Sequence, residues 1–368
     1  MGERRPLADR LPTFPWDRLA PYKRTAAAHA GGLVDLSVGT PVDPVPETLQ
    51  RALADAADSP GYPQTWGTPE LRASIEGWLS RRHGVTVAEG AVLPTIGSKE
   101  TVAWLPTLLG LGEGDTVVHP ELAYPTYDVG VRLSGATPVA ADGLASLGPA
   151  PVSMVWVNSP SNPTGRVLGV DHLRKVVQWA RERGVIVASD ECYLDLGWDG
   201  TEPVSILHPD VCGDSHENLL ALHSLSKRSN LAGYRAAFLT GDPALVKELL
   251  EVRKHSGMIV PAPVQAAMKA ALDDDAHAAE QKERYRARRT RLRSAFEGAG
   301  WKVEHSEAGL YLWASHPDLD AWGAVEHLAE RGIIVAPGDF YGRAGSGHVR
   351  VAFTATDERV AEAAARLA

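Results

Sequence analysis

Cysteine is scarce in this chain, and so are the features that mark several special classes of protein. The 368 residues include only two cysteines, Cys192 and Cys212. Two cysteines so placed form neither a disulfide framework nor a metal-binding pair, so we expect a cytoplasmic protein without a metal site. No apolar run approaches the roughly 18 to 20 residues of a membrane-spanning helix, and we expect no membrane contact. Residues 1–6 also lack the apolar core of a signal peptide.

Positive charge is also in short supply. The net charge is -9 and the isoelectric point is near 5.8, whereas a nucleic-acid footprint needs a concentrated basic face. We therefore expect no nucleic-acid partner. Only nine of the 37 basic residues are lysines, so a lysine that follows a predicted strand carries more weight here than in an average sequence.

The chain is longer than a usual single domain, and its pattern predicts an α/β protein with two domains. From about residue 46 to 262, strand runs alternate with helical stretches, as in a parallel sheet covered on both faces. Helices are predicted at 69–83, 99–109 and 170–183, and one long helix at 263–298 with a kink near 273–275. The predicted parts are an N-terminal arm and small-domain segment (1–45), a large domain (46–270) and a small C-terminal domain (271–368).

Three predicted buried strands are each followed by polar residues of complementary chemistry. Asn162 follows the run at 152–157, Asp190 and Tyr193 follow the run at 185–188, and Lys227 follows the run at 219–222. In an open parallel sheet, the carboxyl ends of the strands form the ligand crevice. An amide, a carboxylate, a phenol and an amine at that edge are the parts needed to hold pyridoxal phosphate.

Each of these residues has a role toward this cofactor and also an ordinary alternative. Lys227 would form a Schiff base and then move a proton, whereas most lysines in Ser-x-x-Lys are surface residues. Asp190 would pair with the pyridinium nitrogen and keep the ring protonated, although an acidic residue after a strand is more often a helix cap. Tyr193 and Asn162 would reach the ring oxygen; the alternatives are a half-buried tyrosine and a plain turn.

A second group of residues suits the cofactor phosphate. The turn at 97–99 follows an apolar run and opens a predicted helix, whose first backbone amides make an anion seat. Its alternative is an ordinary capping turn. Two serines and an arginine flank Lys227, and an arginine fork matches a phosphate dianion. The candidates are Gly97, Ser98, Lys99, Ser224, Ser226 and Arg235.

Three further residues are candidates for the ring and the substrate. Tyr124 is suited to stack on a flat heteroaromatic ring, although core packing is the commoner fate of a tyrosine. Arg350 is a charged residue inside an apolar strand run, so it needs a partner. That partner is either a substrate carboxylate or an internal acidic residue. Gly39 could let its backbone approach the same carboxylate, or it could be a simple turn glycine.

In their order and spacing, these motifs resemble those of the class I/II aminotransferases, which are fold-type I pyridoxal phosphate enzymes. The resemblance implies a mostly parallel seven-stranded sheet and the cofactor roles given above. It places Gly39, Asn162 and Arg350 at the substrate. It also implies a homodimer with shared active sites, in which Tyr62 reaches the phosphate of the neighbouring subunit. The motifs are Gly39-Thr-Pro, residues 62–72, Gly97-Ser-Lys, Tyr124-Pro, Asn162-Pro-Thr-Gly165, Asp190-x-x-Tyr193, Ser224-x-x-Lys227 and Val349-Arg350.

Within this family, the chain looks similar to the actinobacterial N-succinyldiaminopimelate aminotransferases of lysine biosynthesis, through stretches at 11–19, 61–67, 253–261 and 263–265. We expect a ping-pong transfer between glutamate and a 2-oxo acid, with N-succinyl-LL-2,6-diaminopimelate as the favoured substrate. The alternatives are an aminotransferase for aspartate, aromatic or N-acetylornithine-like substrates, and a pyridoxal phosphate C–S lyase.

Two readings from other classes are disfavoured. A cofactor-binding sensor would carry a fused DNA-binding module, and the N-terminal arm has no helix-turn-helix pattern. A nicotinamide enzyme would need a dinucleotide fingerprint, and the glycines at 110, 112 and 114 lack its spacing. The residues that read the distal carboxylates of the substrate stay open, with Arg24, Lys99 and Arg253 as candidates by charge alone.

Overall fold

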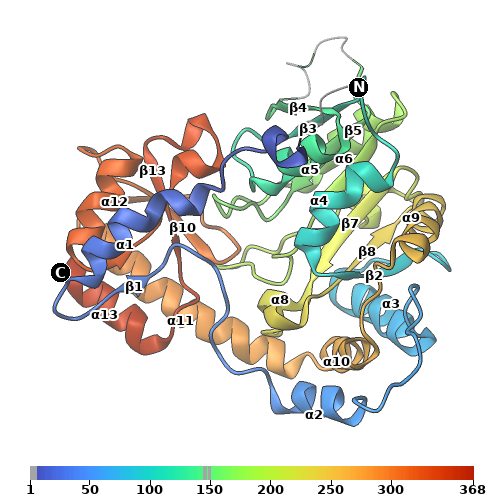
Figure 1. The fold of residues 1–368 in the computed structure, drawn as a ribbon, viewed down its shortest axis with the longest axis horizontal. Helices are drawn as coiled ribbons and strands as arrows, with labels where there is room; N and C mark the ends of the chain where they lie inside the picture. The colour runs from blue at the N-terminus through green and yellow to red at the C-terminus, as the bar shows by residue number, and fades with distance from the viewer. Residues whose placement is uncertain (1–5, 144–146, 148–150) are drawn as a thin grey trace.

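A seven-stranded sheet lies at the centre of the larger lobe of the computed structural model, which describes residues 6–143, 147 and 151–368 (Figure 1). The first five residues of the predicted arm lie outside the described residues. The strand order is β2-β8-β7-β6-β5-β3-β4, and only β8 runs antiparallel to its neighbours. The predicted mostly parallel sheet of seven strands is confirmed. Its strands are β2 (Val92–Ile96), β3 (Thr116–His119), β4 (Thr137–Ala140), β5 (Met154–Asn158), β6 (Ile186–Asp190), β7 (Leu219–Ser224) and β8 (Ala236–Gly241).

Helices cover both faces of this sheet because its strands are apolar on both sides. In β5, Met154 and Trp156 belong to one core cluster, whereas Val155 and Val157 belong to another, since successive side chains point to opposite faces. One face packs against α4 (Ser98–Leu108), α5 (Thr126–Ser134) and α9 (Pro243–Ser256). The other face packs against α2 (Glu47–Asp55), α3 (Pro69–His83), α6 (Val170–Arg181) and α10 (Ala262–Asp273).

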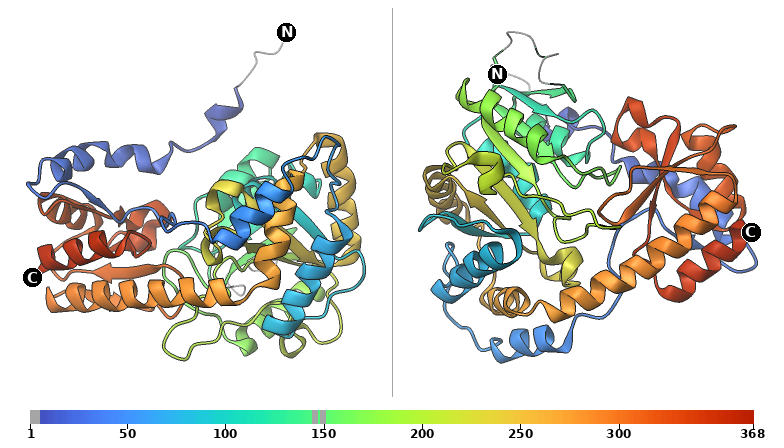
Figure 2. Two further views of the ribbon diagram at one scale, coloured as in Figure 1. Left: turned by 90° about the horizontal axis from the view of Figure 1, so that it is seen from below. Right: turned by 180° about the vertical axis from the view of Figure 1, so that it is seen from behind.

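The smaller lobe combines the N-terminal segment with the C-terminal part of the chain (Figure 2). Its four-stranded sheet has the order β12-β13-β10-β9, and β1 pairs in parallel with β11. Short 3-10 helices lie in both lobes. The remaining elements are η1 (Leu7–Arg10), η2 (Pro15–Leu19), α1 (Ala20–Ala27), β1 (Val34–Asp35), α7 (Pro209–Cys212), α8 (Leu225–Arg228), η4 (Ala232–Tyr234), α11 (Ala276–Gly298), β9 (Lys302–Glu304), β10 (Tyr311–Ser315), α12 (Ala321–Glu330), β11 (Ile333–Ile334), β12 (Ala336–Pro337), η5 (Gly338–Tyr341), η6 (Arg343–Gly345), β13 (His348–Ala352) and α13 (Asp357–Leu367).

The predicted helix at 263–298 forms two helices, and the break between them lies at 274–275, where the kink was predicted. α10 ends at Asp273, Asp274 adopts an extended conformation, and the Asp274 carboxylate accepts a hydrogen bond from the backbone N–H of Ala276 at the start of α11. α10 packs on α2 and α3, whereas α11 runs on into the smaller lobe beside α13 (Figure 2). The predicted domain boundary at residue 270 falls inside α10.

The other predicted helices are confirmed within two residues. Helix α3 spans 69–83 as predicted, because the Thr68 hydroxyl accepts a hydrogen bond from the Leu71 N–H at its start and Gly84 ends it with a φ of 63°. Helices α4 and α6 begin or end one or two residues from the predicted positions. In the part of the chain that the structure describes, no helix has the length and apolar character needed to cross a membrane.

Candidate active site

The carboxyl ends of β5, β6 and β7 bring the predicted residues Asn162, Asp190 and Lys227 to one edge of the large sheet, and Asn162 is tied there by its N–H, which donates to Oδ1 of Asn158. Asn158 at the end of β5 lies beside Asp190 at the end of β6, and Asp190 lies beside Leu222 in β7. Strand β7 ends two residues later and continues directly into α8, the single helical turn that carries Lys227. The parallel pairing therefore aligns the strand ends, and the polar residues after them meet in one place.

Asp190 is a buried carboxylate held by two donors. The Tyr127 hydroxyl donates to Oδ2 over 2.8 Å, and the backbone N–H of Cys192 donates to Oδ1 over 3.2 Å. Burial raises the pKa of Asp190, although these hydrogen bonds oppose the change. Among the described residues, no Lys, Arg or His forms an ion pair with Asp190. A buried acid with donors but without a cation is suited to hold a cationic ligand atom.

Lys227 is half-buried, and its ammonium group donates to the backbone carbonyl of Gly39. Burial lowers the pKa of Lys227, and the positive charges of Arg350 and Arg235 lower it further. A lowered pKa increases the fraction of neutral amine, which is the form that attacks a carbonyl or takes up a proton. Cys192 lies close enough to Lys227 for an electrostatic interaction, so the turn after β6 lies near Lys227.

The start of α4 has the geometry predicted for an anion seat. Gly97 precedes this 11-residue helix with a φ of 75°, and an added Cβ there would lie 2.2 Å from Nη2 of Arg235. The guanidinium of Arg235 therefore lies directly over the Gly97 backbone, next to the first N–H groups of α4. Arg235 is exposed and donates to the carbonyl of Ala232 over 2.8 Å. A helix N-terminus beside an exposed guanidinium is a typical phosphate site.

The predicted serines lie near this seat. Ser98 is the first residue of α4 and lies close enough to Cys192 to lower the pKa of its thiol, and the backbone N–H of Cys192 donates to Asp190. The Ser224 hydroxyl accepts a hydrogen bond from the Ser226 N–H and caps α8. Lys99 instead points toward the N-terminal segment, where its ammonium group lies 5.8 Å from the ring centre of Phe14.

Arg350 is the centre of a second cluster, and it is 3% exposed. Its Nη1 donates to Oδ1 of Asn162 over 2.9 Å, and its Nη2 donates to the Ser37 carbonyl over 2.8 Å. Its guanidinium carbon lies 3.9 Å from the ring centre of Tyr311 and 4.8 Å from that of Tyr341. Within the described ranges no Asp or Glu pairs with Arg350, so the internal ion pair considered above is not found.

Tyr311 connects the Arg350 cluster to Tyr193. Its hydroxyl lies 3.1 Å from the hydroxyl of Tyr193, and an added Cβ at Gly39 would lie 2.4 Å from it. Because the Tyr311 side chain lies over Gly39, a larger residue does not fit at position 39. Burial would raise the pKa of Tyr311, but the charges of Arg350 and Lys227 outweigh burial and lower it.

Four predicted residues make other contacts or lie exposed on the surface. Tyr124 packs edge-on against Tyr127, and burial raises its pKa to about 12. The side chain of Tyr62 is fully exposed in the single chain. Arg253 is buried in α9 and pairs with Glu100 over 2.8 Å, so its charge is already compensated. Arg24 is exposed on α1 in the smaller lobe.

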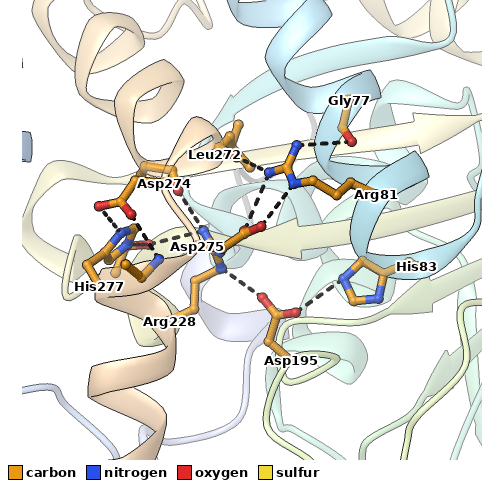
Figure 3. A network of polar contacts seen from close by, with 12 residues as sticks. Gly77, Arg81, His83, Asp195, Arg228, Leu272, Asp274, Asp275 and His277 are labelled. Carbon is orange, nitrogen blue, oxygen red and sulfur yellow. Dashed lines mark hydrogen bonds and ion pairs between the residues drawn. The ribbon is translucent and has the colours of Figure 1, made fainter.

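The helical turn that carries Lys227 is anchored from behind by a network of charged side chains (Figure 3). Arg228 Nε pairs with Asp195 over 2.7 Å, and Arg228 Nη2 lies 3.5 Å from Asp275. Arg81 and His83, from α3 and the residue at its end, pair with the same two carboxylates over 2.9 and 3.2 Å. The network ties α8 to α3 and to the start of α11, so it fixes the backbone next to Lys227.

Sequence reasoning missed Tyr127, Asn158, Tyr311 and Tyr341. Asn158 directly follows the predicted strand run at 152–157, which was an available signal, and Tyr127 lies two residues after the Tyr124-Pro motif. Tyr311 and Tyr341 follow apolar or turn residues and look like core aromatics. Only the pairing of β10 with β13, which sets Trp313 opposite Arg350, brings Tyr311 to the site.

The comparison with known protein families agrees with this geometry. The model described as aminotransferase class I and II matches residues 32–367. This chain belongs to that family. A Mycobacterium tuberculosis protein named as a probable aminotransferase is 64% identical, covering 97% of this chain and 85% of its own. The 4-dedimethylamino-4-oxo-anhydrotetracycline transaminase OxyQ of Streptomyces rimosus is 61% identical, covering 97% and 99%.

A solved structure gives the same fold. A probable N-succinyldiaminopimelate aminotransferase of Thermus thermophilus superposes with a TM-score of 0.84 and is 31% identical, over 96% of this chain and 99% of that one. The aminotransferase therefore has the fold-type I architecture predicted from its motifs.

Aminotransferases of this class use pyridoxal phosphate, and the residues present fit that group. Asp190 is a buried carboxylate that has no cationic partner among the described side chains, and a pyridinium nitrogen would supply one. Arg235 over Gly97 at the start of α4 would hold the phosphate. Lys227, with its lowered pKa, is the amine that would hold the aldehyde carbon.

Proposed function

We propose that this aminotransferase moves an amino group between glutamate and the 2-oxo acid that corresponds to N-succinyl-LL-2,6-diaminopimelate. Support for the aminotransferase reaction comes from a chain of contacts around Tyr311: its ring lies over Gly39, whose carbonyl accepts from Lys227, its ring also lies 3.9 Å from the Arg350 guanidinium carbon, and its hydroxyl lies 3.1 Å from that of Tyr193. The choice of substrate rests on the likeness to the Thermus thermophilus protein and on the motifs at 11–19 and 253–265.

In this proposal, pyridoxal phosphate supplies an electron-withdrawing ring that weakens the bond between the substrate Cα and its hydrogen. Arg350 binds the α-carboxylate, with Asn162 holding the guanidinium in place. Lys227 would accept the proton from the substrate Cα, which its lowered pKa favours, and would hold it for the second proton transfer. Asp190 would pair with the ring nitrogen, and Tyr127 orients Asp190.

We further propose that the enzyme is a cytoplasmic homodimer with shared active sites. Tyr62 is fully exposed in the single chain, as expected for a residue that completes the site of a second copy. Cys192 and Cys212 are free thiols, which suits a reducing compartment. Mixing Tyr62→Ala subunits with Lys227→Ala subunits should regain activity above the sum of the two, because one site of each hybrid holds both native residues. Absence of this complementation would refute shared sites.

The substrate is tested by a panel of 2-oxo acids with glutamate as the donor. The panel contains the oxo form of N-succinyl-diaminopimelate and, because OxyQ is 61% identical, 4-dedimethylamino-4-oxo-anhydrotetracycline. We expect the succinylated acid to give the highest kcat/KM. A higher kcat/KM for the tetracycline ketone would contradict the proposed substrate and would favour that ketone as the amino acceptor.

The reaction type has a separate test. Glutamate alone should convert the bound cofactor to its amine form in the wild type, whereas a C–S lyase on the same fold would not accumulate that form. The Lys227→Ala variant should lose the absorbance of the covalently bound cofactor and its turnover. A fully active Lys227→Ala protein would remove Lys227 from the mechanism.

A further inference from the structure

Tyr341 has a buried hydroxyl, and its ring lies beside the guanidinium of Arg350. It ends η5 and is 3% exposed, and the Arg350 guanidinium carbon lies 4.8 Å from its ring centre. Its backbone carbonyl accepts a hydrogen bond from the Ala123 N–H over 2.8 Å, which holds Tyr341 beside Tyr124 in the larger lobe. In the part of the chain that is described, the Tyr341 hydroxyl has no hydrogen-bond partner. Burial raises the pKa of Tyr341, so the phenol keeps its proton and acts as a donor.

Two more donors next to Tyr341 share this property. The indole Nε1 of Trp16 and the Nε of Arg350 are both buried, and neither has a partner among the described residues. Trp16 packs edge-on against Tyr341 with ring centres 6.3 Å apart, and it also packs on Phe340 at 5.3 Å. An indole N–H and a guanidinium donate and do not accept, so these two cannot satisfy one another.

Three neighbouring donors without acceptors indicate the chemistry of the missing partner. Buried donors that stay unpaired cost folding free energy, so their concentration in one place needs an explanation. The partner must offer acceptor oxygens, and it must be negative because Arg350 has no acidic neighbour in the described chain. A carboxylate meets both conditions.

We propose that Tyr341 donates its phenolic hydrogen to the α-carboxylate of the substrate, beside Arg350, and that Trp16 covers this subsite from the N-terminal segment. This inference rests on the proposed role of Arg350 in the aminotransferase reaction. It adds a binding residue from η5 and a cover from the segment before α1, so the subsite is built from three separate parts of the chain.

The Tyr341→Phe variant tests this subsite in the holoenzyme. It removes one hydroxyl and keeps the ring on Arg350 and Trp16. The reaction of the bound cofactor with glutamate and with alanine would be measured, because the two amino acids share the α-carboxylate and differ in the second one. Loss of a hydrogen bond to a charged group predicts that the KM values for both rise by the same factor, about 10- to 100-fold.

Two further measurements do not depend on turnover. The affinity of the holoenzyme for succinate, measured by calorimetry, should fall by a similar factor in Tyr341→Phe. The melting temperature should stay the same or rise, because an unpaired buried donor has been removed. The control is Tyr22→Phe, the same chemical change in a ring that packs on Trp322 in the smaller lobe; it should leave KM and succinate binding unchanged.

Three outcomes would overturn the inference. Unchanged KM values and succinate affinity would mean that the hydroxyl does not touch the substrate. A change for glutamate alone would assign Tyr341 to the distal carboxylate. A lower melting temperature with unchanged affinity would identify a buried water as its partner. If the wild type rejects the succinylated substrate but reacts with glutamate, the proposed substrate fails while the test of Tyr341 stands.

Discussion

The hydroxyl of Tyr127 donates a 2.8 Å hydrogen bond to the carboxylate of Asp190, inside the core of the larger lobe. Tyr127 is itself fixed, because its ring stacks on Trp156 with ring centres 4.9 Å apart. Burial raises the pKa of Asp190, and the Tyr127 hydrogen bond is one of the contacts that hold it down. Asp190 is proposed to hold the cofactor ring, and its protonation state therefore depends on Tyr127 in α5.

The Tyr127→Phe variant should show this control as a pH effect. Without the hydroxyl, the pKa of Asp190 rises further, because a hydrogen bond to its charged form is lost. Protonated Asp190 cannot hold a pyridinium, so the acid limb of kcat/KM should move to higher pH. The measurement is a pH–rate profile of both proteins. An acid limb at an unchanged pH would show that Asp190 does not govern it.

The contact between Gly97 and Arg235 predicts a strong effect from one methyl group. In Gly97→Ala, the new Cβ would lie 2.2 Å from Arg235 Nη2, and alanine would have to adopt a φ of 75°. Displacing Arg235 costs a charge-assisted hydrogen bond to the phosphate, so we expect pyridoxal phosphate to bind about 10- to 100-fold more weakly.

Gly77→Ala is the matched control, because an added Cβ there meets nothing within 4 Å on the exposed side of α3. Its cofactor affinity should equal that of the wild type, measured by titration of the cofactor-free proteins. Equal affinities for all three proteins would show that the seat at Gly97 is not the phosphate site.

The sequence predicted the residues that follow strands better than those inside them. Asn162, Asp190 and Lys227 could be found because polar side chains after apolar runs are unusual, and parallel pairing brings strand ends together. Arg350 could be found because a charge inside an apolar strand needs a partner. Their common location thus follows from the order of the strands.

Tyr311 and Tyr341 could not be predicted in the same way. Each is an aromatic residue in an apolar setting, which is typical of a core position. Their place against Arg350 depends on the antiparallel register of β10 with β13 and on the path of η5. At 273–275 the sequence predicted a kink but not a complete break, because the extended conformation of Asp274 depends on where α10 and α11 pack.

The network behind α8 predicts the stability of two arginine variants. Arg228 is nearly buried between Asp195 and Asp275, and it also donates to the Ala271 carbonyl over 2.8 Å. Arg228→Ala leaves Asp195 buried with only His83 as a partner, so we expect a loss of about 3–5 kcal/mol in the free energy of unfolding. The exposed pair of Arg293 and Glu297 should contribute less than about 1 kcal/mol. Urea titration of Arg228→Ala and Arg293→Ala would contradict the prediction if the two losses were similar.

The buried pair of Glu191 and His223 predicts how the free energy of unfolding depends on pH. Glu191 Oε2 lies 3.7 Å from His223 Nε2, and both side chains are almost completely buried. Burial raises the pKa of Glu191 to about 7 and lowers the pKa of His223 to about 3. At neutral pH the imidazole is therefore uncharged and gives the carboxylate no counter-charge.

As the pH changes, the ionisations of Glu191 and His223 change the free energy of unfolding in opposite directions. Because the folded-state pKa of Glu191 is raised from 4.5, its protonated form stabilises the fold below about pH 4.5, and this stability is lost as the pH rises through 7. Because the folded-state pKa of His223 is lowered from 6.5, its neutral form keeps full stability above about pH 6.5 and loses it as the pH falls toward 3. The two contributions largely cancel between about pH 4.5 and 6.5, and above that range only the Glu191 contribution changes with pH.

The Glu191→Gln variant separates the contribution of Glu191 from that of His223. Glutamine keeps the oxygen that accepts from the Ile206 N–H over 2.8 Å, but it cannot ionise. The wild type should therefore lose stability between pH 6.5 and 8, whereas Glu191→Gln should not, and the variant should be the more stable protein at pH 8. At pH 5 the order should shift toward the wild type, because Glu191 is protonated in the folded protein there, whereas the contribution of His223 is the same in both proteins. Melting temperatures across this range decide the matter: parallel curves for the two proteins would mean that Glu191 does not titrate in the core.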